Sequence, residues 1–337
     1  MAIIIKNGTI VTASDSIRAD LAIRDDKIVN IASSLQAEPS DTVIDAAGSF
    51  VLPGGIDVHT HFDWNFAHLK TADDFESGTR AAAVGGITSI INFTNHKRGN
   101  TLVEDLEEWQ DKASSSVIDY GFHIIVNQLE DKMLDEFPEL VERGVTSIKV
   151  FMAYKGVFML NDKELYAIMQ RAGASGMITN VHAENGDVID MKIAELLSEQ
   201  KTAPIYHAHS RPSALEAEAT HRAIVIAQMA EAPLYVVHVS CAEAMMHIDR
   251  ARRMGQYVLG ETCPQYLTLD QSYLELPDLE GGKYVCSPPL REKKDQDALW
   301  RGIATGTIST IGSDHSPFQF AEKKLLGQQD FSKIPNG

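Results

Sequence analysis

Four histidines, a lysine and an aspartate occur in this 337-residue sequence at or near the ends of short apolar runs. His59 and His61 are two residues apart after one such run, and side chains at positions i and i+2 of a strand face the same side, so both imidazoles can reach one metal ion. Each candidate also has an ordinary explanation, such as a hydrogen-bonded core histidine or a helix-capping aspartate. Together they predict a metal site, because all are residue types that ligate metals; the other candidates are Lys149, His182, His238 and Asp314.

Lys149 interrupts the otherwise apolar run Ser147–Met152. A protonated ammonium group beside two divalent cations is costly to bury. That cost disappears if the neutral amine has reacted with carbon dioxide, since the resulting carbamate is an anion that can bind one metal ion with each oxygen. The sequence thus predicts a binuclear site bridged by carboxylated Lys149.

A binuclear site of this kind holds a hydroxide between metal ions about 3.5–4 Å apart, because the metals lower the pKa of water. The carboxylate of Asp314 is then placed to take the proton of the hydroxide and return it to a leaving nitrogen. The chemistry predicted is hydrolysis of a C–N bond.

Parallel strands and helices must position these residues. Apolar strand-like runs recur from Phe50 onward at intervals of roughly 30 to 55 residues with helical segments between them, such as those predicted over 71–84 and 134–143. This alternation predicts a closed (β/α)8 barrel of the TIM type, whose active site lies at the carboxyl ends of its strands. The strands are expected at 89–93, 120–126, 147–152, 177–182, 234–239, 257–261 and 308–313.

The first 52 residues have a different pattern of short strands and turns. Ile3–Ile5 and Thr9–Val11 flank Asn7-Gly8, which predicts one hairpin, and a second hairpin is expected across the polar turn 24–27. We therefore expect an α/β protein with two domains, the N-terminal half of a β-sandwich over 1–52 and a catalytic barrel over 53–337.

Composition excludes several classes of protein. Forty-four per cent of the residues are hydrophobic, which is typical of a globular chain, and no apolar run is long enough to span a membrane. The net charge of −17 disfavours binding to nucleic acid or to an anionic membrane surface. Three scattered cysteines and the absence of a signal-like N-terminus favour a reducing, cytoplasmic location.

Two further histidine-containing segments are interpreted as ordinary surface. His207-Ala208-His209 repeats the spacing of the first pair but follows a helix, so we expect loop or surface. The basic segment Asn95–Arg98 is expected to be a solvated loop, with contact to a carboxylate as the alternative.

The sequence closely resembles the cyclic amidohydrolases called dihydropyrimidinases or D-hydantoinases. The resemblance covers the whole chain and is carried by PGGIDVHTHFD, DDFESGTRAAAVGGITSIINF, IKVFMAYKG, ETCPQYL, CSPPLR and GSDHSPF, in this order. It implies that the six candidates are the metal ligands, with two divalent metal ions, zinc by preference, and carbon dioxide or bicarbonate to carboxylate Lys149. It also implies that Tyr154 polarises the scissile carbonyl, and that Ser287 and Asn336 hold the amide edge of the substrate through backbone groups.

The resemblance further implies that the ring of a dihydropyrimidine (dihydrouracil or dihydrothymine) or of a 5-substituted hydantoin is opened to an N-carbamoyl amino acid. The exocyclic substituent would meet the loop 63–69 and the segment containing Phe151 and Phe158. Trp64 and Phe66 are expected either to pack on an aromatic substituent or to narrow the pocket for dihydrouracil.

Several alternatives stay open on the sequence. Allantoinase and, less well, dihydroorotase share the metal chemistry, whereas the scaffolding collapsin response mediator proteins have lost metal ligands that this chain retains. Family members continue past position 337, so we expect a fragment of a longer polypeptide. A homotetramer is implied by the resemblance alone.

Overall fold

The computed structural model describes residues 1–66, 69–130 and 132–337, and these divide into two compact units, Met1–Gly55 and Ile56–Gly337. No helix in the described ranges is long and apolar enough to cross a membrane.

The first unit consists of two small sheets. One has the strand order β5-β4-β1-β6 and the other β3-β2-β7. This unit has two small clusters of buried hydrophobic residues. One consists of Ala2, Ile4 and Ala22, and the other of Ile10, Ala19 and Leu21. The strands are β1 (Ile3–Lys6), β2 (Thr9–Val11), β3 (Ser16–Arg18), β4 (Asp20–Arg24), β5 (Lys27–Ala32), β6 (Thr42–Asp45) and β7 (Phe50–Val51).

One of the two expected hairpins is confirmed and the other is wrong. β4 and β5 pair antiparallel across Asp25-Asp26, whose positive φ angles of 50° and 59° suit a tight hairpin turn. By contrast, β1 pairs with β4 and β6 while β2 pairs with β3 and β7, so the turn at Asn7, with φ 63°, passes the chain from one sheet to the other. The dipeptide predicted the turn but not the strand partners.

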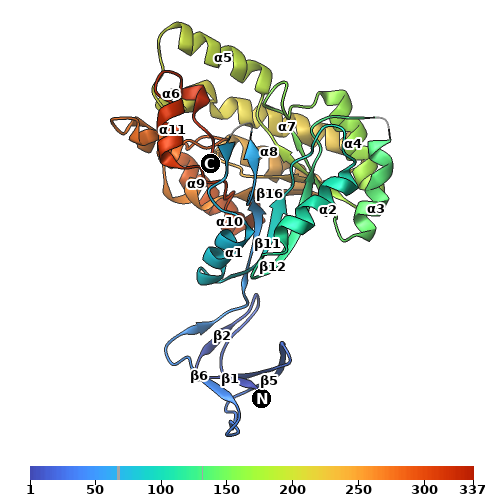
Figure 1. Ribbon diagram of the computed structural model, residues 1–337, viewed down its shortest axis with the longest axis vertical. Helices are drawn as coiled ribbons and strands as arrows, with labels where there is room; N and C mark the ends of the chain where they lie inside the picture. The colour runs from blue at the N-terminus through green and yellow to red at the C-terminus, as the bar shows by residue number, and fades with distance from the viewer. Residues whose placement is uncertain (67–68, 131) are drawn as a thin grey trace. The chain divides into compact units, whose positions relative to one another are not determined.

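Eight parallel strands and the helices around them form the second unit, which confirms the predicted barrel (Figure 1). The strand order β17-β16-β15-β14-β13-β12-β11-β8 follows the chain, and a parallel bridge between Thr60 and His315 brings the two ends of the sheet together. The strands are β8 (Gly55–Thr60), β11 (Ile87–Phe93), β12 (Asp119–Ile125), β13 (Ser147–Phe151), β14 (Ile178–His182), β15 (Leu234–Val236), β16 (Val258–Thr262) and β17 (Thr310–Ile311), with the short pair β9 (Asn65–Phe66) and β10 (Leu69–Lys70) after β8.

Helix starts follow local capping chemistry. Asp74 accepts a hydrogen bond from Ser77 N at the start of α1, and equivalent capping boxes begin α2 at Thr101 and α4 at Asn161. Because Asp74 caps α1, the helix expected from residue 71 begins at Phe75. The α-helices are α1 (Phe75–Val84), α2 (Leu102–Ala113), α3 (Phe137–Glu142), α4 (Asp162–Ala174), α5 (Gly186–Ser198), α6 (Ile205–Ser210), α7 (Ser213–Met229), α8 (Ala242–Arg253), α9 (Pro264–Thr268), α10 (Lys293–Thr305) and α11 (Phe320–Leu326), and the 3₁₀ turns are Met133–Glu136, Gln271–Glu275, Glu280–Tyr284 and Phe331–Lys333.

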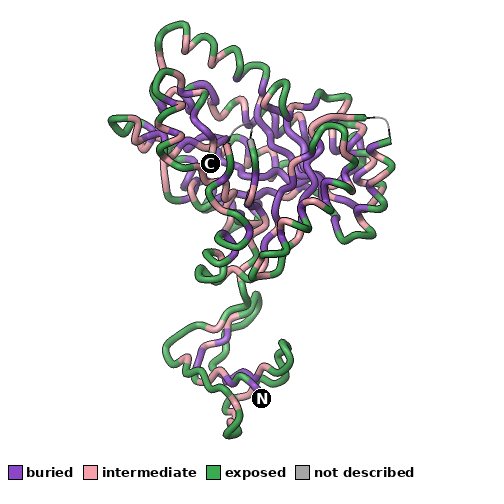
Figure 2. The backbone as a smooth tube through the Cα atoms, viewed as in Figure 1, coloured by how far each residue is buried: buried purple, intermediate pink, exposed green. Residues whose placement is uncertain are grey.

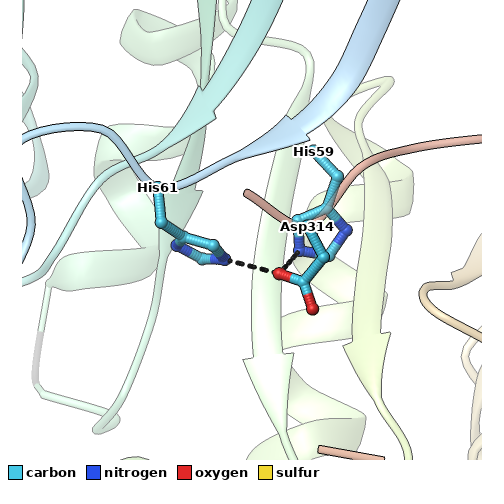
Figure 3. A group of neighbouring side chains, drawn as sticks. All are labelled: His59, His61 and Asp314. Carbon is cyan, nitrogen blue, oxygen red and sulfur yellow. Dashed lines mark ion pairs between the residues drawn. The ribbon is translucent and has the colours of Figure 1, made fainter. Parts of the chain in front are cut away.

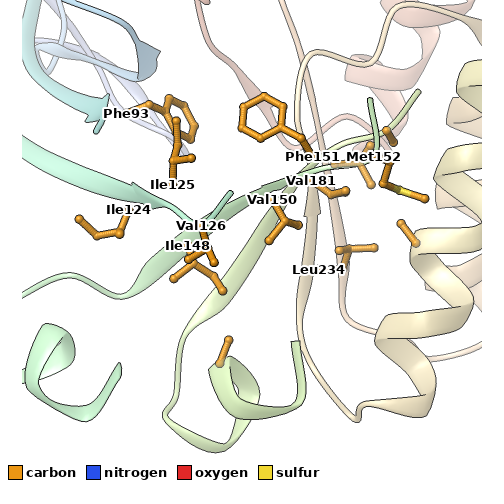
Figure 4. Packing of buried hydrophobic residues seen from close by; sticks show 14 of the residues in the cluster. Phe93, Ile124, Ile125, Val126, Ile148, Val150, Phe151, Met152, Val181 and Leu234 are labelled. Carbon is orange, nitrogen blue, oxygen red and sulfur yellow. The ribbon is translucent and has the colours of Figure 1, made fainter. Parts of the chain in front are cut away.

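The barrel strands are the most buried part of this unit (Figure 2). All five residues of β13 are buried. Two of them, Ile148 and Val150, belong to the same buried cluster as Ile124 and Val181 of the adjoining strands (Figure 4). Parallel strands covered by helices are apolar on both faces, so a polar side chain in this region stands out. Two strands are shorter than expected: β15 ends at Val236 and β17 covers only Thr310–Ile311, so that His238 and Asp314 lie beyond them.

Candidate metal centre

His59, His61 and Asp314 form a compact group at the point where β8 meets the segment after β17 (Figure 3). The Nε2 atoms of His59 and His61 lie 3.1 and 3.3 Å from the same carboxylate oxygen, Oδ1 of Asp314. One potential ligand atom from each residue lies within 4.8 Å of the others. Two imidazoles and a carboxylate converging in this way suit a divalent metal ion of the zinc type.

His182 and His238 form a second group beside the first. His182 ends β14, and its Nδ1 lies 3.0 Å from Nε2 of His238. The ring of His238 is also 5.6 Å from that of His59, centre to centre, so the four imidazoles surround one small volume.

Lys149 lies in β13 between these groups and is 1% exposed. Its Nζ is 4.8 Å from the centre of the Phe93 ring and 5.1 Å from that of Phe151. Phe93 also contacts the His61 ring, and Phe151 contacts the His182 ring. Among the described residues no carboxylate forms an ion pair with Lys149, and burial lowers the pKa of its amine to about 8.

The electrostatics of the first group favour a cation. Burial alone would lower the pKa of His59, but the carboxylates of Asp314 and Glu261 outweigh it and raise the pKa to about 9. Burial alone would raise the pKa of Asp314, but His59 and His61 outweigh it and hold the pKa well below its usual range. Metal ions and protons compete for such atoms, so a site that draws a proton to His59 also fits a metal ion.

The ring nitrogens available for a metal follow from the hydrogen bonds of the others. His59 Nδ1 lies 2.7 Å from Oε1 of Glu261, and His182 Nε2 lies 2.8 Å from Oε2 of Glu184. Since a carboxylate only accepts, these nitrogens carry the protons, which leaves His59 Nε2 and His182 Nδ1 as lone-pair donors. These are the two nitrogens that face the other predicted ligands.

Glu184 and Glu261 were missed at the level of sequence. Glu261 is the last residue of the predicted strand 257–261, and carboxylates at the carboxyl ends of barrel strands are candidates by the same rule that selected Asp314. Gly312 explains how close this carboxylate comes: a Cβ there would lie 2.8 Å from His59 Cβ and 3.0 Å from the Glu261 carboxyl group.

The backbone is in the left-handed region at several positions around this group. His238, Asp314 and Tyr154 have φ angles of 40°, 54° and 66°. Such conformations are uncommon outside glycine and concentrate at functional sites. Here they turn the chain two or three residues after the ends of strands β15, β17 and β13.

A cavity of about 970 Å³ opens above the metal-ligand candidates, and all six of them line it. Tyr154, Ser287 and Asn336 line it as well, and Nδ2 of Asn336 is 3.5 Å from the Tyr154 hydroxyl. Burial raises the pKa of Tyr154 to about 12, so its hydroxyl keeps its proton at neutral pH. The structure thus brings these nine sequence-predicted residues to one cavity, while their roles stay predictions.

Aromatic side chains form one wall of the cavity. The ring of Phe158 stacks on Trp64 at 5.8 Å and on Phe151 at 5.0 Å, centre to centre. The side chain of Phe66 and residues 67–68 of the loop predicted to meet the substituent lie outside the described residues.

The two surface predictions need correction. His207 lies on α6, is 3% exposed and lines the cavity, with Nε2 donating to Cys286 O at 2.9 Å, whereas His209 is exposed. A helix turns residues i and i+2 to different faces, so the two histidines differ. His96 is also buried and pairs with Asp105, while Lys97 and Arg98 are exposed.

Known proteins of similar sequence and structure match this chain over most or all of its length. The sequence model of the family described as "Amidohydrolase family" matches residues 50–320. D-hydantoinase of Geobacillus stearothermophilus is 53% identical, over 100% of this chain and 72% of the relative, and D-hydantoinase of Streptomyces coelicolor is 49% identical, over 99% and 73%. The crystal structure of the dihydropyrimidinase from Brevibacillus agri NCHU1002 superposes with a TM-score of 0.97 at 52% identity, covering 100% of this chain and 73% of that one.

Proposed function

The chain belongs to the amidohydrolase family as a cyclic amidohydrolase of the hydantoinase and dihydropyrimidinase type, and we propose that it opens the rings of 5-substituted hydantoins and of dihydropyrimidines. In this reaction the oxygen of a water molecule bonds to a ring carbonyl carbon. The carbon–nitrogen bond breaks, its electron pair stays on the ring nitrogen, and that nitrogen takes a proton. The product is an N-carbamoyl amino acid.

Two divalent metal ions, zinc by preference, would be held by His59, His61, His182, His238, Asp314 and carboxylated Lys149. The fit rests on the donor set and on the hydrogen bonds that leave one nitrogen of His59 and one of His182 facing the other ligands. When bound, such ions polarise a carbonyl oxygen and lower the pKa of water to near neutrality.

Carboxylation of Lys149 is supported by its surroundings. Its amine is buried, has a lowered pKa and lies between the two histidine groups without an ion-pair partner in the described part of the chain. A neutral amine can attack carbon dioxide, and the resulting anion removes the cost of a buried ammonium group.

Asp314 would accept a proton from the attacking water and return it to the leaving ring nitrogen. Its low pKa keeps it ionised and able to accept. Tyr154 would donate a hydrogen bond to the carbonyl oxygen as negative charge develops there, and its raised pKa keeps that proton in place. Ser287 and Asn336 line the cavity near Tyr154, which supports backbone contacts to the amide edge of the ring.

The cavity supports substrates with a large exocyclic group. About 970 Å³ is far more than a bare six-membered ring fills, and the wall of Trp64, Phe151 and Phe158 offers aromatic faces for packing. The names of several relatives, D-hydantoinases, support the D enantiomer. The convergence of all six ligand candidates beside Tyr154 in one cavity is the observation that carries the proposal.

Substrate profiling tests it. Protein supplied with zinc and bicarbonate should hydrolyse dihydrouracil and D-5-phenylhydantoin, with the higher kcat/KM for the hydantoin, and bind two metal ions per chain. The relatives described above are hydantoinases and a dihydropyrimidinase and not allantoinases, so allantoin serves as the control substrate. A higher kcat/KM for allantoin would contradict the proposal.

A further inference from the structure

Arg211 is a buried arginine in the wall of the cavity whose role neither the ligand set nor the reaction above explains. It follows α6 directly, is 6% exposed and lines the cavity. Its Nη1 donates to Oε2 of Glu184 at 2.7 Å, and its Nε has no hydrogen-bond partner among the described residues. A buried guanidinium with an unused donor beside a reaction cavity calls for an explanation.

The first contact of Arg211 leads to a predicted metal ligand. Oε2 of Glu184 accepts from both Arg211 Nη1 and His182 Nε2, at 2.7 and 2.8 Å. The same carboxylate oxygen is therefore held between the guanidinium and the imidazole. Since a carboxylate only accepts, His182 carries its proton on Nε2, which leaves Nδ1 free to ligate.

The second contact leads to the other side of the cavity. The guanidinium carbon of Arg211 lies 5.6 Å from the centre of the Tyr154 ring, within the range of a cation–π interaction. Tyr154 follows β13 with a left-handed backbone, and its ring also lies 5.2 Å from that of His182. One arginine therefore contacts both the carboxylate that orients His182 and the tyrosine aimed at the substrate.

The backbone of Arg211 is itself fixed. Its carbonyl oxygen accepts from Nη1 of Arg291, whose Nη2 donates to Oε2 of Glu216 at 2.8 Å. This second pair is buried as well, with side chains 7% and 3% exposed. The guanidinium is therefore presented to the cavity from a rigid support.

We propose that Arg211 is a positioning residue that couples metal binding at His182 to the placement of Tyr154. It acts through Glu184 on one side and through the face of the tyrosine ring on the other. The inference rests on the proposed function, because it takes His182 as a ligand and Tyr154 as the donor to the carbonyl oxygen.

Metal binding separates a coupling role from a purely structural one. Metal-free Arg211→Met protein, titrated with Zn²⁺ by calorimetry, should bind one of the two ions 10- to 100-fold more weakly, as expected when the partner of an orienting carboxylate is lost. Glu184→Gln should show a similar loss, and the double variant no more than either single one, because both act on one path. Arg222→Met is the matched control, since Arg222 of α7 pairs with Glu218 on the same helix and with Asp162 of α4, and this variant should bind zinc like the wild type.

Arg211→Lys separates the two contacts and guards against loss of folding in the methionine variant. Lysine retains a charge for Glu184 but not the flat guanidinium that faces Tyr154. For Arg211→Lys we expect two zinc ions per chain at close to wild-type affinity, an unchanged KM and a kcat at least tenfold lower. In a separate variant, Arg211→Gly, added guanidinium ion should restore part of the lost kcat.

Two results would overturn the inference. One is Arg211→Met protein, folded by circular dichroism, that binds both zinc ions as tightly as Arg222→Met and turns over within twofold of it. The other is additive losses in the Arg211→Met/Glu184→Gln double variant. A wild-type chain that binds no zinc would instead refute the proposed function, and the inference with it.

Discussion

His59 Nδ1 and Glu261 Oε1 lie 2.7 Å apart, although the two residues are 202 positions apart in the chain. Both are fully buried, and the same carboxyl group also accepts from His238 N at 3.0 Å and from the Tyr235 hydroxyl at 2.8 Å. Glu261 therefore holds one predicted ligand by its ring and another by its backbone. The spatial arrangement of these predicted ligands therefore depends on a carboxylate that does not line the cavity.

Replacing Glu261 tests this dependence. Glu261→Gln keeps an acceptor for His59 but removes the negative charge that favours its Nδ1–H form, so zinc affinity should fall about 10- to 100-fold. Equilibrium dialysis against a chelator series measures the change. Glu243→Gln, at an exposed position on α8, is the control and should leave affinity unchanged. Equal zinc affinities of Glu261→Gln and Glu243→Gln would show that Glu261 does not support metal binding.

Lys149→Met should separate metal binding from stability. Methionine fills a similar volume without a charge to bury, so the metal-free variant should unfold at the same or a higher temperature than the metal-free wild type. Bound zinc should fall from two ions to at most one, measured by elemental analysis, with Lys293→Met at an exposed position as the control. Two retained ions per chain would refute the bridging role of carboxylated Lys149.

Asp314→Asn should abolish most activity without disturbing the backbone. Asparagine tolerates the left-handed φ of 54° at this position, whereas alanine there adds strain. Loss of the proton-carrying carboxylate should lower kcat by about 10²- to 10⁴-fold. Steady-state kinetics with zinc in excess gives the value. A loss of only twofold would mean that another base moves the proton.

Trp64→Ala should change the preference among substrates. If Trp64 packs on an aromatic substituent, its loss should lower kcat/KM for D-5-phenylhydantoin about tenfold, the worth of one aromatic contact. Unsubstituted hydantoin, which cannot reach this wall, should change little and serves as the internal control. A rise for phenylhydantoin would show instead that Trp64 narrows the pocket.

Lys323 should make stability depend on pH. It is 2% exposed on α11, and burial lowers the pKa of its amine from 10.5 to about 8. Between these values the unfolded chain binds more protons than the folded one, so this residue makes stability rise with pH from about 8 to 10.5, by on the order of 3 kcal/mol in all. Below pH 8 both states are protonated and its full cost is present.

Urea unfolding of the wild type and of Lys323→Met at pH 7.5 and 10 measures this effect. The advantage of the methionine variant should shrink as pH rises, because the wild type alone is relieved of a buried charge. At each pH, the difference in free energy of unfolding between the two proteins removes the contributions of the other titrating groups, Lys149 among them. A difference that is constant with pH would contradict the lowered pKa.

The barrel could be predicted from the sequence because its strands and helices are specified locally. Apolar runs such as Ser147–Met152, separated by capped amphipathic helices, allow few other parallel arrangements. The hairpin expected at Asn7-Gly8 failed for the opposite reason. A turn dipeptide specifies the bend, but β1 pairs with β4 and with β6, whose residues lie as far as 39 positions along the chain from their partners.

The candidate ligands could also be predicted, because barrel topology carries every strand end to one rim. His59 and Asp314 needed only to follow their strands in order to meet. The position of His207 could not be predicted, because a segment between a helix and Pro212 suggests a loop, whereas a helical turn directs His207 inward, apart from His209.

By itself, the sequence determined the types of the candidate ligands and the order of the elements that carry them. Only the tertiary structure decided which nitrogen of His59 and which of His182 is free, since that depends on the hydrogen bonds that these rings donate to Glu261 and Glu184. It also brought Arg211 and Tyr154 together in the wall of the cavity. Hydrogen bonds act over about 3 Å, a distance that spacing along the chain does not encode for residues on different strands.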